Sequence, residues 1–199
     1  MLESNSQAGQ DKFILSLFKN DYKGTFVDVG CSLPKHINNT LLLEENNWTG
    51  ISVDIENFSE QWKIRKTPFI HQDALTCEYN ELFKKHGLPK VIDYLSLDIE
   101  GEGLRYLALK KVMESGYEFK VMTVEHDVSR GNVYDLTERI PQRKFLTELG
   151  YVLLCADVSY SSTQPYEDWW INPKYMKESD YIYYKCSSMV WWEILKLKK

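Results

Sequence analysis

The sequence predicts an α/β fold, a doubly wound sheet of seven strands with helices on both faces and an antiparallel last strand. Short apolar segments rich in β-branched residues alternate with segments of helical spacing along most of the 199 residues. Two apolar segments, 26–29 and 91–97, carry an acid near or directly after their carboxyl end, Asp28 and Asp98, and each is followed by a glycine and then a helix. The last two expected strands follow each other without a helix. We expect residues 1–199 to form a single domain.

Each expected strand is a run of β-branched, aromatic or aliphatic residues bounded by turn-forming residues. The strands are 26–29, 50–55, 67–71, 91–97, 119–124, 150–156 and 181–186. Apolar residues at helical spacing, with polar caps such as Asp11 and Thr40, predict the helices. These are 12–18, 41–45, 57–66, 78–86, 102–114, 137–149 and 189–197. Segment 160–177 is rich in Ser, Pro, Tyr and Trp, and we expect it to be irregular.

The composition is that of an ordinary globular protein, with 43% hydrophobic and 27% charged residues. The net charge of −5 and the lack of a basic stripe argue against a nucleic-acid partner. No apolar run approaches the ~20 residues of a membrane span, and the first residues lack signal-peptide character. We therefore expect a cytoplasmic protein with no membrane partner. The cysteines are widely spaced, which indicates free thiols: Cys31, Cys77, Cys155 and Cys186.

A nucleotide-type site is expected beyond the carboxyl ends of the strands, where the backbone must approach a ligand closely. Asp28 and Gly30 end the first strand, and no second glycine follows to complete a pyrophosphate-binding fingerprint. A nucleoside-type cofactor such as S-adenosylmethionine therefore fits better than a dinucleotide. Asp54 lies 24 residues after Gly30, where an acid binds ribose hydroxyls in such folds. Asp73 and Ala74 follow the third strand and suit an adenine amino group.

Four stretches together carry a resemblance to a known family. They are 6–11 (Ser-Gln-Ala-Gly-Gln-Asp), 24–30 with Asn39 and Thr40, 94–101 (Tyr-Leu-Ser-Leu-Asp-Ile-Glu-Gly), and Val124 with Glu125; Trp48-Thr-Gly50 also fits. Over nearly its whole length the chain resembles FkbM-type methyltransferases, a branch of the S-adenosylmethionine-dependent class I enzymes. The resemblance implies a seven-stranded Rossmann-like fold and O-methylation, often of a sugar hydroxyl, and hence a carbohydrate acceptor.

The resemblance also implies site residues. Asp28, Gly30, Asp54 and Asp73 would contact the cofactor, and the further candidates are Gln7, Asn39 and Thr40. Many family members carry Glu at the position of Asp54, and the aspartate keeps a carboxylate for the ribose. The turn 31–35 (Cys-Ser-Leu-Pro-Lys) is unusual for the family, so the contacts of the methionine end stay open.

Acids gather after the fourth and fifth strands, at Asp98 and at Glu125-His126-Asp127. Neighbouring strands lie ~4.8 Å apart, so these carboxylates would converge above the sheet. Oxygen-rich clusters suit Mg²⁺ or Mn²⁺, which predicts a metal held by Asp98, Glu125 and Asp127. A sugar hydroxyl needs a base, and the catalytic candidates are Asp98, Glu125 and His126. Strand alternation places His126 on the opposite face from Glu125 and Asp127.

The aromatic segment 166–175 is a candidate platform for the acceptor. Flat rings suit the apolar face of a sugar, which predicts substrate contacts by Asp168, Trp169 and Trp170. The alternative is a loop that its tryptophans pin to the core.

Other functions fit the same pattern. An RNA 2′-O-methyltransferase would share fold and cofactor but need a basic groove. A nucleotide-binding oxidoreductase would need the missing glycines, and a non-catalytic binder would not need so many acids at strand ends. A homodimer is compatible with the sequence.

Overall fold

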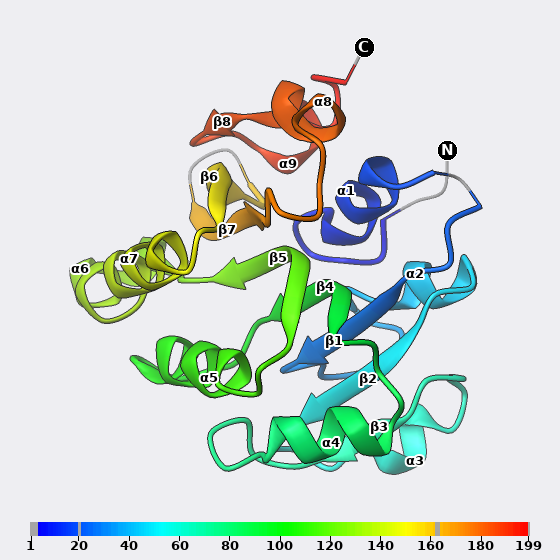
Figure 1. Ribbon diagram of the computed structural model, residues 1–199. Helices are drawn as coiled ribbons and strands as arrows, with labels where there is room; N and C mark the ends of the chain where they lie inside the picture. The colour runs from blue at the N-terminus through cyan, green and yellow to red at the C-terminus, as the bar shows by residue number, and fades with distance from the viewer. Residues whose placement is uncertain (1–3, 20, 162–163, 199) are drawn as a thin grey trace.

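The computed structural model describes residues 4–19, 21–161 and 164–198. Its sheet of eight strands has the order β3-β2-β1-β4-β5-β7-β6-β8 (Figure 1). The strands are β1 (Thr25–Val29), β2 (Thr49–Asp54), β3 (Phe69–His71), β4 (Val91–Leu97), β5 (Glu118–Glu125), β6 (Val152–Ser159), β7 (Pro165–Ile171) and β8 (Cys186–Ser187). Strands β1 to β5 pair in parallel, and β7 is antiparallel to both of its neighbours. The predicted doubly wound α/β class is confirmed.

The helices are short, and most connect consecutive strands. They are α1 (Gln10–Leu17), α2 (Leu41–Glu45), α3 (Ser59–Trp62), α4 (Tyr79–Lys85), α5 (Leu104–Met113), α6 (Asn132–Tyr134), α7 (Ile140–Glu148), α8 (Glu178–Tyr181) and α9 (Trp191–Ile194). A π-helical turn, Asp135–Arg139, joins α6 to α7. In the part of the chain that the structure describes, no helix has the length and apolar character needed to cross a membrane.

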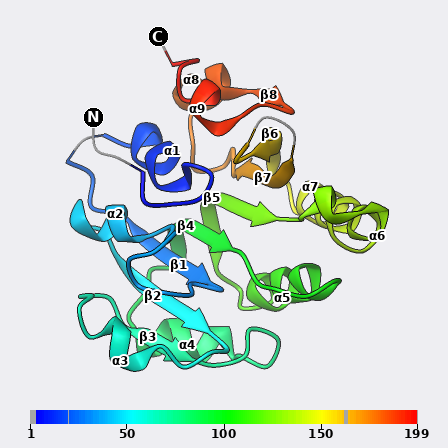
Figure 2. The same ribbon diagram turned by 180° about the vertical axis from the view of Figure 1, so that it is seen from behind.

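Two hydrophobic clusters sandwich the sheet. One packs α4, α5 and α7 against one face, through side chains such as Phe83, Leu109 and Leu146. The other packs α1, α8 and α9 against the opposite face, through Phe13, Tyr181 and Ile194. Both views show α1, α8 and α9 on one side of the sheet and α4 and α5 on the other (Figure 1, Figure 2). The expectation of helices on both faces is therefore confirmed.

The sequence-based assignment of the last strand is wrong. Segment 181–186 forms the end of α8 and a 3-10 turn, and only Cys186–Ser187 pairs with the sheet, as β8 beside β6. The antiparallel strand is instead β7, inside the segment expected to be irregular. The strand lacks the usual alternation of apolar and polar residues, because two acids, Glu167 and Asp168, are buried within it. Both acids have partners: Trp169 Nε1 donates to Glu167, and Arg143 pairs with Asp168.

Candidate functional site: a cleft at the carboxyl edge of the sheet

A cleft of about 620 Å³ opens at the carboxyl ends of the parallel strands, where the strand order reverses between β1 and β4. Ten of the site residues predicted from the sequence line it: Gln7, Asp28, Gly30, Asn39, Asp54, Asp73, Ala74, Asp98, Glu125 and Asp127. Five others do not line it: Thr40, His126, Asp168, Trp169 and Trp170. That any of the ten binds a ligand stays a prediction, but the structure brings them to one place.

Gly30 allows the turns after β1 and β4 to touch. Its φ is +83°, and a Cβ built on it would lie 1.8 Å from the carbonyl oxygen of Asp98. The Gly30 amide donates to the Val53 carbonyl, and the Asp98 amide donates to the Val29 carbonyl, each at 2.9 Å. A side chain at position 30 would force the turn that carries Asp98 away from β1.

Asp28 lies at the floor of the cleft and is almost fully buried. Thr40 lies behind it, and the Thr40 hydroxyl donates to Asp28 Oδ2 at 2.9 Å. Burial raises the pKa of Asp28 to about 7, although the Thr40 hydrogen bond and the Arg65 charge act in the opposite direction. Thr40 therefore positions Asp28 and does not itself face the cleft. Asn39 is held in a similar way, because its side-chain amide donates to Ser96 Oγ at 2.9 Å.

Asp54 and Asp73 line the end of the cleft formed by β2 and β3. The two carboxylate oxygens of Asp54 accept from the amides of Ser32 and Glu56, at 2.8 and 2.9 Å. Asp73 Oδ1 accepts from the Leu75 amide at 2.8 Å. These backbone bonds orient the carboxylates, and each oxygen keeps a further lone pair for a ligand donor.

Arg105 of α5 is fully buried beneath the other end of the cleft. Its Nε lies 2.8 Å from Glu125 Oε2, and its Nη2 lies 2.9 Å from Asp127 Oδ2. Burial by itself lowers the pKa of Arg105, but the two carboxylates outweigh burial and raise it. Burial and the adjacent Asp98 charge raise the pKa of Glu125 well above its usual range, against the effect of Arg105. The cation that neutralises this acidic cluster is thus a side chain of the protein.

The ligand set predicted for a divalent metal does not fit this geometry. Within the described ranges, only His126, Asp157 and Asp168 bring three potential ligand atoms within 4.8 Å of one another. Asp98, Glu125 and Asp127 form no such group, and Arg105 binds the last two. The structure gives no support to a Mg²⁺ or Mn²⁺ site at these three acids, because Glu125 and Asp127 are already paired with a guanidinium.

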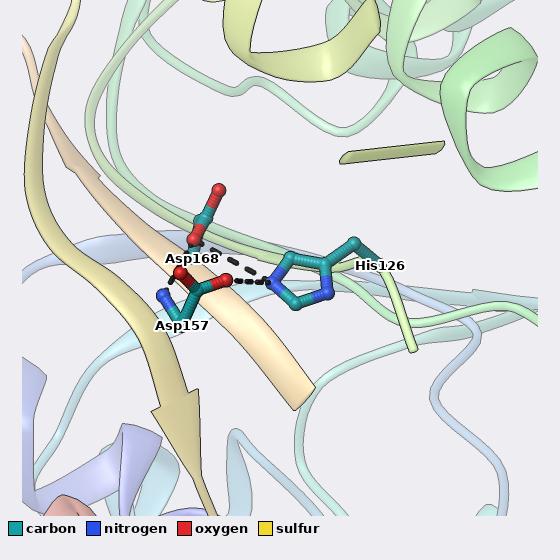
Figure 3. A group of neighbouring side chains, drawn as sticks. All are labelled: His126, Asp157 and Asp168. Carbon is teal, nitrogen blue, oxygen red and sulfur yellow. Dashed lines mark hydrogen bonds and ion pairs between the residues drawn. The ribbon is translucent and has the colours of Figure 1, made fainter. Parts of the chain in front are cut away.

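His126 is fully buried outside the cleft and points to the opposite side from its neighbours, as strand alternation predicts. The Val128 amide donates to His126 Nδ1, and His126 Nε2 faces Asp157 and Asp168 at 3.6 and 3.5 Å (Figure 3). The prediction that His126 is the base is wrong, since no acceptor in the cleft can reach it.

The two aspartates beside His126 also have cationic partners. Arg143 bonds both oxygens of Asp168, at 2.7 and 2.8 Å, and Arg139 Nη1 lies 2.7 Å from Asp157 Oδ1. Despite burial, Arg143 and His126 lower the pKa of Asp168 to about 2. This cluster joins α7 to β6 and β7, so the predicted substrate contact of Asp168 is also wrong. Both aspartates thus have arginine partners within the protein.

Trp169 and Trp170 do not form an acceptor platform. They lie in β7 with no exposed surface and point into opposite hydrophobic clusters. Trp169 stacks on Phe13 with ring centroids 4.1 Å apart. The prediction of acceptor contacts is wrong, and the alternative, tryptophans held in the core, describes the structure.

We therefore expect Trp169→Ala and Trp170→Ala each to lower the free energy of unfolding by about 3–5 kcal/mol. Urea unfolding followed by circular dichroism measures this loss, with the partly exposed Trp192→Ala as the control. A raised acceptor KM with unchanged stability would contradict the core assignment.

Tyr166 of β7 lines the cleft beside Asp98, a position that no local pattern in the sequence indicates. Its hydroxyl donates to Asp98 Oδ2 at 2.6 Å. Arg105 was also missed, but a local signal exists. Arg105 shares the buried face of α5 with Ala108, Leu109 and Val112, at helical spacing. A cation on an apolar face needs a buried anion as a partner.

No protein-family model and no curated protein matches the chain. Among solved structures, the chain is similar to a "putative rRNA-methylase" from Clostridium thermocellum. The TM-score is 0.56 at 16% identity, over 86% of this chain and 99% of that chain. A protein designated PH0851 matches with a TM-score of 0.50 at 12% identity, over 85% of this chain and 45% of that chain.

These likenesses show the fold alone, an α/β domain built on a mostly parallel Rossmann-like sheet. Membership of the FkbM family stays a prediction from the sequence motifs.

Proposed function

We propose that the chain is an S-adenosylmethionine-dependent O-methyltransferase whose acceptor is a sugar hydroxyl. The observation that supports the proposal is a single cleft whose two ends carry carboxylates suited to different roles. Asp54 and Asp73 lie at the ends of β2 and β3, and Asp98 lies beyond β4. The first two offer oriented carboxylates for ribose hydroxyls and an adenine amino group, and the third is placed to take a proton. The cleft volume of about 620 Å³ suits a nucleoside together with a small acceptor.

In the proposed reaction, a residue of this chain accepts the proton that the acceptor hydroxyl loses. When bound, the cofactor supplies a methyl group on a sulfonium; the acceptor oxygen takes the methyl, and the electron pair of the broken carbon–sulfur bond stays on sulfur. Asp98 accepts the hydroxyl proton, because it is the carboxylate at this end whose hydrogen-bond donor is a neutral tyrosine. Glu125, which is paired with Arg105, lies behind Asp98, and the charges of the two carboxyl groups act on each other.

The charge of the cleft favours an uncharged polyol over a nucleic acid. Among the described residues that line it, eight carry carboxyl groups and one, Arg130, carries a guanidinium. The carboxyl groups are Asp28, Asp54, Glu56, Asp73, Asp98, Glu100, Glu125 and Asp127. Phosphate groups would be repelled by such a lining, whereas sugar hydroxyls can donate to it. Methylation of rRNA is the second candidate, because the similar Clostridium thermocellum structure bears that description.

Calorimetry tests the cofactor assignment. We expect S-adenosylhomocysteine to bind the wild-type protein, and Asp54→Asn to raise its Kd roughly 10-fold or more through lost charge-assisted hydrogen bonds. The exposed Glu81→Gln, remote from the cleft, is the matched control. An Asp54→Asn protein that binds as tightly as wild type would remove Asp54 from the site.

A methyl-transfer screen tests the acceptor. We expect label from radioactive S-adenosylmethionine to enter sugars, glycosides or glycans from the panel, and rRNA offered in parallel to stay unlabelled. Transfer to rRNA alone would overturn the sugar assignment and establish the second candidate.

A further inference from the structure

Tyr166 ties together the two strand ends that carry the acids of the cleft. Its hydroxyl donates to Asp98 Oδ2 at 2.6 Å, beyond the end of β4. Its backbone carbonyl accepts from the amides of His126 and Asp127, each at 3.0 Å, at the end of β5. The side chain and the backbone of one residue therefore fix the positions of Asp98 and Asp127 relative to each other.

The Tyr166 ring has little freedom to move. It is 4% exposed, and Tyr160 packs edge-on against it with ring centroids 5.4 Å apart and an interplanar angle of 90°. Burial and the nearby Asp98 and Glu125 charges raise the pKa of Tyr166 well above its usual range. The Tyr166 hydroxyl is thus held as a hydrogen-bond donor to Asp98.

We propose that Tyr166 is a positioning residue that holds Asp98 as the proton acceptor for the substrate hydroxyl, an inference that rests on the proposed function. In this step the oxygen–hydrogen bond of the acceptor breaks and the proton binds an Asp98 oxygen, while the acceptor oxygen bonds to the transferred methyl. Tyr166 keeps its own proton throughout. A hydrogen bond to one carboxylate oxygen fixes the plane of the group and leaves lone pairs directed at the cleft.

The charged and titratable groups around Asp98 come from four elements. They are Asp28 on β1, Glu125 on β5, Arg105 on α5, and Tyr166 with Glu167 on β7. Burial raises the pKa of Glu167 to about 8, and it does not line the cleft. Tyr166 contributes a neutral donor bonded directly to Asp98, so its removal acts on the orientation of the proton acceptor itself.

Tyr166→Phe tests this role because it removes the hydroxyl and keeps the ring. We expect kcat to fall roughly 10- to 100-fold, the effect of losing one hydrogen bond to a charged group, with the KM for S-adenosylmethionine unchanged.

Tyr175→Phe is the matched control. The Tyr175 hydroxyl also donates to a carboxylate, Glu118 Oε1 at 2.8 Å, but Glu118 begins β5 at the edge opposite the cleft. This variant should keep the wild-type kcat. A thermal melt of both variants separates loss of fold from loss of chemistry.

A double-mutant cycle with Asp98→Asn makes the assignment specific. We expect Tyr166→Phe to have little further effect on kcat once Asp98 is neutral, since the two residues act as one unit. An equal loss in both backgrounds would overturn the positioning role while wild-type methyl transfer still stands. A wild-type protein that methylates no acceptor would overturn the proposed function, and this inference with it.

Discussion

Asp98→Asn is expected to lower kcat for methyl transfer by about 10²–10⁴-fold, the usual contribution of a general base. The amide keeps the shape of the side chain and can still accept from the Tyr166 hydroxyl, which lies 2.6 Å from Asp98 Oδ2. It cannot take a proton from the acceptor. The Kd of S-adenosylhomocysteine should change little, because the residues assigned to the nucleoside lie at the other end of the cleft. Steady-state kinetics and calorimetry on the same preparation measure both effects.

Asp93→Asn is the control for this substitution. Asp93 lies near the start of the same strand, β4, where it pairs with Lys120 at 2.6 Å and does not line the cleft. This variant is expected to lose stability and to keep its kcat in the folded fraction. If Asp98→Asn retained more than about a tenth of wild-type kcat, Asp98 would not be the base, because a lost general base costs at least ~10²-fold.

Arg105→Met is expected to lower the free energy of unfolding by about 3–5 kcal/mol, the usual cost of breaking a buried ion pair from one side. Methionine fills much of the same space but leaves Glu125 without its cation, while Asp127 keeps Arg130, whose Nε lies 2.7 Å from Asp127 Oδ2. Both carboxylates are nearly fully buried, so water cannot replace the guanidinium. Urea unfolding at neutral pH measures the loss.

Two further variants show whether charge causes that loss. Lys144→Met removes an exposed cation that lies 3.9 Å from Glu148, and its effect should stay within about 0.5 kcal/mol. Adding Glu125→Gln to Arg105→Met should restore part of the stability, because an amide tolerates burial better than an unpaired carboxylate. A loss below about 1 kcal/mol in Arg105→Met, or no recovery in the double variant, would speak against a charge-based role.

Much of the cleft could be predicted because its signals are local. The run 91–97 predicts a buried strand, Asp98 follows directly, and the carboxyl ends of parallel strands meet at one edge of the sheet. The same reasoning predicts that Asp28, Asp54 and Asp73 lie at this edge of the sheet, and all three line the cleft. Alternation along β5 also predicts that His126 lies on the opposite face from Glu125 and Asp127, which argues against His126 as the base.

The errors arose where a partner comes from a distant part of the chain. Glu125 and Asp127 suggested a metal because Arg105, some 20 residues earlier, was not recognised as their counter-ion. Asp168 suggested a substrate contact because Arg143, its partner from α7, comes close to it only in the folded protein.

The sequence by itself determined the alternation of strands and helices, the acids at the strand ends and the absence of a pyrophosphate fingerprint, because each depends on neighbouring residues. Only the tertiary structure decided which acids stay free to act. In the folded protein, Arg105 pairs with Glu125 and Asp127, and Arg143 pairs with Asp168. Trp169 and Trp170 are buried in the core. Asp98, in contrast, has a neutral tyrosine, Tyr166, as its hydrogen-bond donor. A charge acts on a ligand only when no closer charge of opposite sign is packed against it, and that pairing is a property of the folded chain.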